Sequence, residues 1–190
     1  MSQPAKIMLR PVYLWSGLLL VMAVGLVVAW SLGAVPGASS RSKATLLPFG
    51  HMYATWAGFE ADRYMAAWLI KRFIDPEAEF SFLPIGSEVP ADGSIAFDMP
   101  GGRWFRGGRQ STAELILHDI GAEDPALDSM VGMVRKLEMA YWLVDPMSDA
   151  GRMKSQILRI IDGTPDSEER LNKVLGYFDG VYAAGGQVPK

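Results

Sequence analysis

A charge-free N-terminal stretch is the feature that most restricts how this chain folds. Residues Val12–Leu32 contain no charged side chain, and as an α-helix these 21 residues span about 31 Å, the thickness of the hydrocarbon core of a bilayer. Trp15 near one end and Trp30 near the other fit the aromatic belts of membrane interfaces. We therefore expect a transmembrane helix over residues 12–33, preceded by an N-terminal tail (residues 1–11).

A cleaved signal peptide is the alternative interpretation of this stretch. The apolar region of a signal peptide is typically about 7–15 residues long, and the stretch here is longer. The small residues that follow nevertheless offer a cleavage site: Gly33, Ala34, Gly37 and Ala38.

Flanking charges give a weak indication of topology. Lys6, Arg10 and the N-terminal amine lie on one side of the stretch, and Arg41 and Lys43 lie on the other. By the positive-inside rule we expect a cytoplasmic N-terminus, with the rest of the chain on the periplasmic side of a bacterial inner membrane.

Small residues recur along one face of the expected transmembrane helix. Gly17, Gly25, Ala29 and Gly33 are four or eight residues apart, so they share a face on which another helix can approach closely. Small residues are also simply common in membrane helices, and the sequence does not separate the two explanations. If the face packs against other helices, the anchor also docks onto a larger membrane assembly.

The charge of the remaining chain is strongly acidic. No acidic residue precedes Glu60, whereas four basic residues do, which leaves 14 of the 18 basic residues against all 21 acidic ones, a net charge of −7. This charge argues against a nucleic-acid partner, because binding to a phosphate backbone normally uses a basic face. Cysteine is absent, so disulfides, thiolate metal sites and cysteine nucleophiles are excluded as well.

For the rest of the chain we predict a linker (residues 34–50), a soluble domain (residues 51–186) and a short tail (residues 187–190). Apolar residues at helical spacing predict a helix over 60–73 that stops at Asp75-Pro76, where proline interrupts the hydrogen-bond ladder.

Alternating apolar and polar residues predict two short strands, residues 79–82 and 95–97. Ser111 and Glu114 have capping-box spacing and should begin a helix that Gly121 ends. The further expected helices cover residues 125–144, 152–161 and 165–183, the last with Thr164 as its N-cap. The fold class expected is α+β, mostly helical: one transmembrane helix, then a strand pair packed with about five helices.

No catalytic motif, metal-ligand cluster or cofactor-binding loop is present, so we predict no catalytic residue, metal or cofactor. Residues 101–109 form a Gly/Arg loop whose amides and guanidiniums suit an oxyanion, a phosphate or an acidic protein surface. Together with the polar residues of the 60–73 helix, this gives the following oxyanion-binding candidates: Asp62, Arg63, Arg72, Asp98, Arg103 and Arg106.

Each candidate has a structural alternative. Asp62 suits the positive N-terminus of its own helix. The Gly/Arg loop can be an exposed connection whose Trp104 and Phe105 tuck into the core. Alternatively these two aromatic residues touch lipid headgroups or a partner subunit, and we treat them as interface candidates.

Residues 62–80 (DRYMAAWLIKRFIDPEAEF) resemble the C-terminal domain family of the chromate-resistance protein ChrB. The pattern of that family is close to Asp-Arg-x-Ala-Cys-Pro-Trp-Leu-Ile-Arg-Arg-Phe-Ile-Asp-Pro-Glu-Ala. Later blocks are similar too, and the resemblance covers most of residues 55–184. The later blocks are residues 93–101, 124–127 and 177–182.

The departures from the pattern concern reactive residues. Ala66-Ala67 stands where the family carries Cys-Pro, and Trp104-Phe105-Arg106 stands where members usually carry a histidine before a Cys-Ser-Phe stretch. The family is linked to chromate sensing and handling in the cytoplasm and usually lacks an anchor. The resemblance therefore implies a retained scaffold in a repurposed, non-catalytic domain.

The leading hypothesis is a membrane-anchored, non-catalytic accessory subunit docked on a larger membrane complex, such as one of respiratory or photosynthetic electron transport. Its expected partners are membrane protein subunits and the lipid bilayer. The alternative is an oxyanion- or metal-binding enzyme or sensor that retains a ChrB-like activity.

Overall fold

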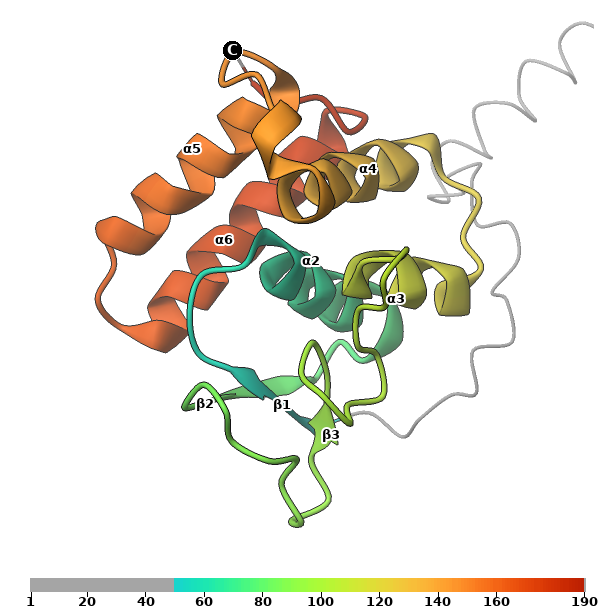
Figure 1. Ribbon diagram of the computed structural model, residues 1–190, viewed down its shortest axis with the longest axis vertical. Coiled ribbons are helices and arrows are strands. Elements are labelled where there is room, and N and C mark those ends of the chain that lie inside the picture. The colour runs from blue at the N-terminus through green and yellow to red at the C-terminus, as the bar shows by residue number, and fades with distance from the viewer. Residues whose placement is uncertain (1–49, 190) are drawn as a thin grey trace, which may run out of the picture. The chain divides into compact units, whose positions relative to one another are not determined.

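The computed structural model describes residues 50–189 as an α+β domain of five α-helices and three short strands (Figure 1). This confirms the expected mostly helical fold class. The elements in chain order are β1 (Met52–Trp56), α2 (Ala61–Leu69), a π-helical turn η1 (Ile70–Ile74), β2 (Glu79–Leu83), β3 (Ile95–Ala96), α3 (Thr112–Ile120), α4 (Pro125–Met139), a 3₁₀ turn η2 (Tyr141–Leu143), α5 (Asp149–Asp162) and α6 (Ser167–Ala183).

None of the helices within residues 50–189 combines the length and the apolar character needed to cross a membrane. The expected transmembrane helix over residues 12–33 lies outside the described residues, as do its small-residue face and residues 34–49 of the linker. These assignments stay predictions.

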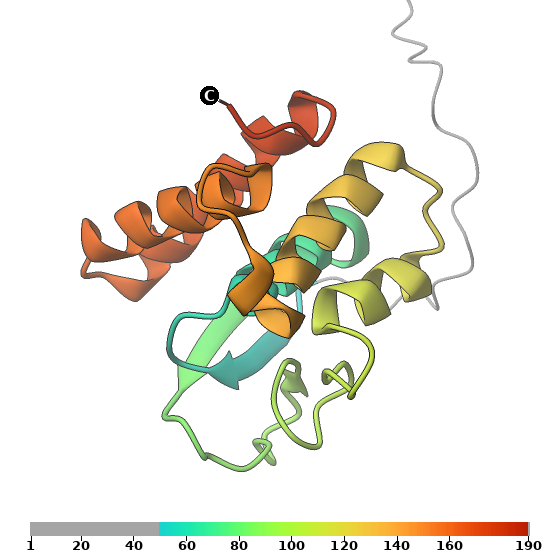
Figure 2. The same ribbon diagram turned by 45° about the horizontal axis from the view of Figure 1, so that its top comes forward.

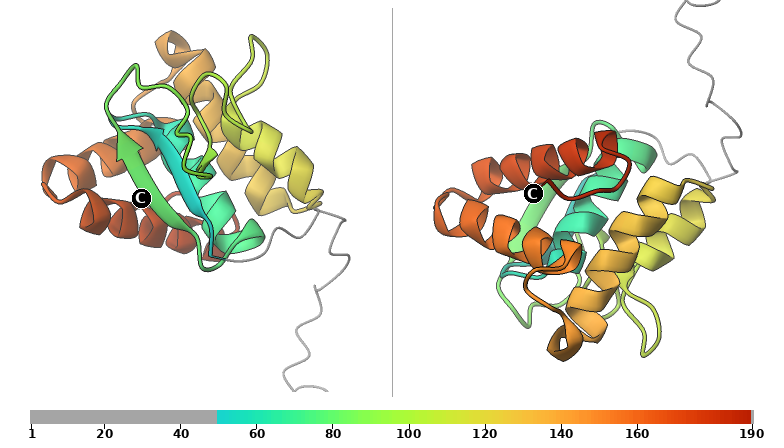
Figure 3. Two further views of the ribbon diagram at one scale, coloured as in Figure 1. Left: turned by 90° about the horizontal axis from the view of Figure 1, so that it is seen from below. Right: turned by 90° about the horizontal axis from the view of Figure 1, so that it is seen from above.

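The strands form one parallel sheet in the order β2-β1-β3, which corrects the expected strand pair. The two predicted strands are present, but they do not pair with each other, because the unpredicted strand β1 lies between them. In the register, Tyr53 of β1 is opposite Phe80 of β2 and Ile95 of β3. Helix α2 supplies the crossover that a parallel β1–β2 pair requires. The left view of Figure 3 looks onto the sheet, with the helices behind it.

Helix α2 is the centre of the domain. All nine of its residues are buried, and it contacts α3, α4 and α6. Figure 2 shows the helices arranged as two neighbouring pairs around it, α3 with α4 and α5 with α6. The helix expected over 60–73 ends its α-helical part at Leu69 and continues as the π-turn η1, in which the Asp75 N–H donates to the Ile70 carbonyl (2.8 Å). The predicted stop at Asp75-Pro76 is confirmed.

The sequence predicted both ends of α3 correctly, but it misplaced the C-terminal end of α4 and the N-cap of α6. Ser111 and Glu114 form the expected capping box of α3, and Gly121 ends the helix with a φ of 63°. Helix α4 stops at Met139 rather than at 144, because the backbone of Ala140 leaves the helical region. Helix α6 begins at Ser167 with Asp166 as its N-cap, which corrects the expected Thr164 cap.

Gly151 allows a close contact in the first turn of α5. A Cβ atom at this position would lie 2.4 Å from the carbonyl oxygen of Asp145 and 2.5 Å from that of Pro146. Both neighbours are backbone atoms, so neither can move away without distorting the α4–α5 connection. A glycine is therefore required here for steric reasons, although a glycine inside a helix normally destabilises it.

We predict that Gly151→Ala destabilises the domain by about 1–3 kcal/mol, the usual effect of overpacking a tight contact. Gly176→Ala is the matched control, since Gly176 is exposed on α6 and its added Cβ would meet nothing within 4 Å. This variant should be as stable as the parent or more stable by up to about 1 kcal/mol, because alanine favours the helix. Urea unfolding followed by circular dichroism measures both, and equal midpoints for the two variants would contradict the steric argument.

Candidate functional site

Four of the predicted site residues meet in one partly buried group of charges. We call this group the carboxylate–arginine cluster. It combines residues from the start of α2, the end of β3, the Gly/Arg loop and the end of α4. Its members are Glu60, Asp62, Arg63, Asp98, Arg106 and Glu138.

Arg63 is the buried cation of the cluster, with only 4% of its side chain exposed. Its Nε donates to Thr55 Oγ1 in β1 (3.1 Å) and its Nη1 donates to the carbonyl of Gly58 (3.2 Å). Its Nη2 lies 3.0 Å from Glu60 Oε2 and 3.1 Å from Asp98 Oδ2. Every nitrogen of the guanidinium therefore has a partner within the domain.

Asp62 caps a helix other than its own. Its carboxylate is fully buried and accepts hydrogen bonds from the backbone N–H groups of Thr112 (2.6 Å) and Ala113 (2.9 Å), which begin α3. Burial raises the pKa of Asp62, and the two backbone donors oppose that rise. The predicted capping role is thus present, but it serves α3 rather than α2.

Glu138 plays the corresponding role for α2. From the last turn of α4, its Oε1 accepts from the N–H of Ala61 (2.9 Å). The positive end of each helix is thus covered by a carboxylate from another helix, α4 onto α2 and α2 onto α3, which satisfies N–H groups that lack intrahelical partners.

Asp98 is a buried carboxyl group that follows strand β3. It has a φ of 48°, a left-handed conformation that aspartate tolerates better than most residues. Its Oδ1 accepts from Thr112 Oγ1 (2.8 Å), while its Oδ2 faces Arg63 without the alignment of a hydrogen bond. Burial first, and then the charge of Asp62, raise the pKa of Asp98 to about 7, although Arg63 opposes the rise.

Arg106 fixes the Gly/Arg loop to the cluster. Its guanidinium pairs with Glu60 and lies 3.4 Å from Glu138 Oε2. Burial would raise the pKa of Glu60, but hydrogen bonding to Arg106 and the charge of Arg63 hold it below its usual range. Four carboxylates thus surround two guanidiniums, so the cluster is negative and disfavours an added anion.

The other two oxyanion candidates lie elsewhere. Arg72 pairs with Asp179 of α6 (2.7 Å), and its guanidinium lies over the ring of Tyr182 (4.8 Å to the centroid). Arg103 stacks on the ring of Trp104 in the Gly/Arg loop (4.7 Å). The structure therefore joins four of the six candidates and separates Arg72 and Arg103 from them.

The two interface candidates have different environments. Trp104 is buried and donates its indole N–H to Asp119 Oδ2 (2.8 Å), so it belongs to the core. Phe105 is 40% exposed, and an interface role remains a prediction for this residue.

Sequence reasoning missed Glu60 and Glu138. The i,i+3 spacing of Glu60 and Arg63 is a local signal that could have identified the first. No local signal marks Glu138, because its partners lie more than 30 residues away in the sequence.

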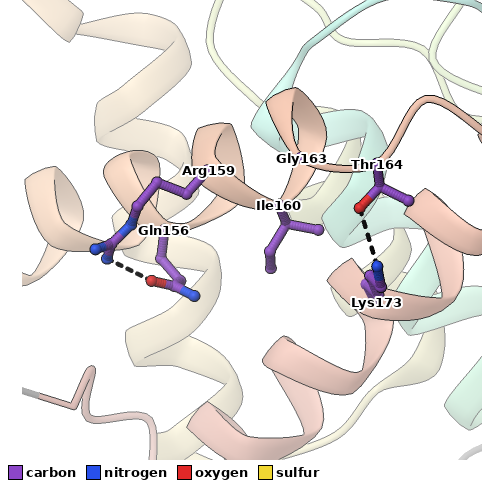
Figure 4. Close-up of a pocket in the computed structure, with 6 residues that line it drawn as sticks. All are labelled: Gln156, Arg159, Ile160, Gly163, Thr164 and Lys173. Atoms are coloured by element: carbon purple, nitrogen blue, oxygen red, sulfur yellow. Dashed lines mark hydrogen bonds between the residues drawn. The ribbon is translucent and has the colours of Figure 1, made fainter.

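A shallow groove between α5 and α6 has a volume of about 370 Å³ (Figure 4). Its cations have partners: Lys173 donates to Thr164 Oγ1 (3.2 Å) and pairs with Glu169 (2.8 Å), and Arg159 bonds to Gln156. None of the predicted site residues lines it. Within residues 50–189, no three histidine, aspartate or glutamate side chains are arranged to hold a metal ion.

Comparison with known proteins gives two matches. Residues 53–185 match the family model described as the C-terminal domain of ChrB. Protein ChrB of Cupriavidus metallidurans is 28% identical over 134 residues, which cover 70% of this chain and 40% of that protein. The chain thus spans less than half of the length of this relative. No solved structure matches the chain.

We predict that Asp62→Ala lowers the free energy of unfolding by about 2–4 kcal/mol, because it leaves two buried N–H groups of α3 without an acceptor. Urea unfolding measures the change. Glu88→Ala is the control, since Glu88 is exposed in the β2–β3 connection and its loss should leave the midpoint unchanged. An Asp62→Ala midpoint equal to that of the control would contradict the capping role.

We also predict that the domain becomes less stable as the pH rises from 5 to 8. The pKa of Asp98 is about 7 in the folded state against 3.8 ordinarily, so the folded state holds a proton that the unfolded state has lost, which is worth on the order of 2–4 kcal/mol. The raised pKa values of Asp62 and Glu138 act in the same direction.

Asp98→Asn isolates the contribution of Asp98. Asparagine also accepts the left-handed φ and stays neutral, so this variant should show a flatter profile and no loss of stability at pH 8. Urea unfolding at several pH values tests this, and parallel profiles for the parent and the variant would contradict it.

Proposed function

This chain belongs to the ChrB C-terminal domain family, and we propose that it is a membrane-anchored, non-catalytic accessory subunit that docks on a larger membrane protein complex. The observation that supports this most is the closed carboxylate–arginine cluster. The cluster residues that match the family pattern, Asp62, Arg63 and Asp98, are buried and bound to groups of the domain itself.

Two further observations support a non-catalytic role. Ala66 and Ala67, which stand where the family pattern has Cys-Pro, are buried within α2 and carry no reactive group. The two guanidiniums of the cluster are outnumbered by carboxylates, so the site lacks the positive potential that transition-state charge or an oxyanion requires.

The proposed anchor is the charge-free helix over residues 12–33, with the domain on the periplasmic side of a bacterial inner membrane. Its face of Gly17, Gly25, Ala29 and Gly33 is the proposed contact with helices of the partner complex. An electron-transport complex is the class we propose.

An oxyanion-binding sensor with a ChrB-like activity is the second candidate. It is favoured by one observation: Asp62, Arg63 and Asp98, which match the family pattern, come together with Arg106 in one site. In this function an oxyanion such as chromate would have to displace carboxylates from the two arginines.

We predict that the full chain, isolated from native membranes in mild detergent, carries a fixed stoichiometric set of membrane subunits. Mass spectrometry of the isolated complex identifies them. Gly25→Leu should release these partners while the chain stays in the membrane, because a bulky side chain prevents close helix approach. Val27→Leu is the control, since residue 27 is about 200° away around the expected helix.

A chain that migrates alone in mild detergent would contradict the accessory role. Saturable binding of chromate or sulfate in calorimetry, weakened by Arg106→Ala, would favour the sensor instead.

A further inference from the structure

The connection between α4 and α5 exposes a group of large apolar side chains. Tyr141 and Trp142 are 64% and 68% exposed, and Leu143 and Met147 are each 75% exposed. We call residues 141–147 the apolar turn. In the right view of Figure 3 this amber segment lies at the margin of the domain.

The apolar turn is an ordered element. The N–H groups of Leu143 and Val144 donate to the carbonyls of Ala140 (2.9 Å) and Tyr141 (3.3 Å), which closes the 3₁₀ turn η2. The rings of Tyr141 and Trp142 pack edge to face, 5.2 Å apart. These apolar side chains are therefore held outward by a folded backbone, at an energetic penalty in water.

The tryptophan of the apolar turn differs from the other tryptophans of the domain, because its indole N–H has no partner there. Trp56, Trp68 and Trp104 each donate an indole N–H to a partner in the domain, at 2.9, 3.0 and 2.8 Å. Among the tryptophans in residues 50–189, only Trp142 donates no such bond, and its indole is open to solvent. An apolar ring with an unused N–H at its edge suits an environment that is apolar on one side and wet on the other.

We propose that the apolar turn inserts into the interfacial region of the lipid bilayer to which the chain is anchored. This inference rests on the membrane anchor of the proposed function. Tryptophan and tyrosine favour the headgroup level of a bilayer, and leucine and methionine supply apolar area below it.

The apolar turn is a small surface that carries a charge. It offers four large apolar side chains. The carboxylate of Asp145 accepts from the N–H of Met147 (2.8 Å), so an acidic group lies within the turn. Insertion is therefore shallow, because a carboxylate must remain at the wet level of the headgroups.

The anchor brings the turn within reach of the membrane. Residues 34–49 extend to at most roughly 55 Å, while a domain of this size has a radius of gyration of about 14 Å. Any face of the domain can then meet the bilayer, and the tether gives the turn a high effective concentration there. Insertion would orient the domain with the C-terminal end of α4 toward the membrane.

The absence of cysteine provides a direct test. Leu143→Cys and Ile85→Cys introduce single labelling sites at two leucine-sized, equally exposed positions (75% each), one in the apolar turn and one in the β2–β3 connection. The full chain is labelled at each site with an environment-sensitive fluorophore and placed in phosphatidylcholine nanodiscs. Emission wavelength and quenching by iodide are then measured, and circular dichroism verifies the fold.

The label at position 143 should emit at shorter wavelength and be quenched at least about threefold less than the label at position 85, because iodide stays in the aqueous phase. Equal quenching of the two labels overturns the inference. Shielding of position 143 that occurs only in nanodiscs made from native membranes also overturns it, in favour of a protein partner.

Carbonate extraction of the membranes tests the anchor separately. A chain that resists extraction but leaves position 143 open to iodide keeps the proposed anchor and contradicts only the insertion. A chain that carbonate removes overturns the anchor and, with it, this inference.

Discussion

The buried carboxylate of Asp62 is the interaction on which the arrangement of the helices depends. Burying a carboxylate is unfavourable unless donors replace the lost water, and here two N–H groups of α3 do so. Asp62 can reach them only while α2 is held in place, and Glu138 of α4 contributes to this by accepting from Ala61. The positions of α2, α3 and α4 are therefore mutually dependent, which is expected to make this part of the domain unfold cooperatively.

The same dependence bears on function. Asp98 and Arg63 complete the cluster by joining the end of β3 to the start of α2, and Arg106 ties the Gly/Arg loop to it. A charge that neutralises a neighbour and caps a helix is not available to an incoming ligand unless the helix moves. The match of Asp62, Arg63 and Asp98 to the family pattern is thus explained by the scaffold alone, which agrees with an accessory role.

The features that the sequence predicted correctly are local ones. Ser111, Glu114 and Gly121 define α3 through contacts within a few residues, and proline at position 76 limits the preceding helix to residues before it. The predicted strand pair lacked β1, because Met52–Trp56 is short and follows a polar linker, and nothing local places it between two later strands. Glu138 was missed for the same reason. The sequence around it does not distinguish it from a solvent-exposed glutamate on a helix, because its partners are distant in the sequence.

The early end of α4 at Met139 produces the exposed apolar turn. Apolar residues continue past Met139, so the sequence favours a longer helix, yet the chain turns at Ala140 and exposes Tyr141 and Trp142. The close approach at Gly151 holds the connection that follows against α5. The 3₁₀ turn instead holds the rings of Tyr141 and Trp142 edge to face and exposed to solvent. Exposing apolar area in an ordered turn is unfavourable for an isolated domain, and it becomes favourable when an apolar environment covers it.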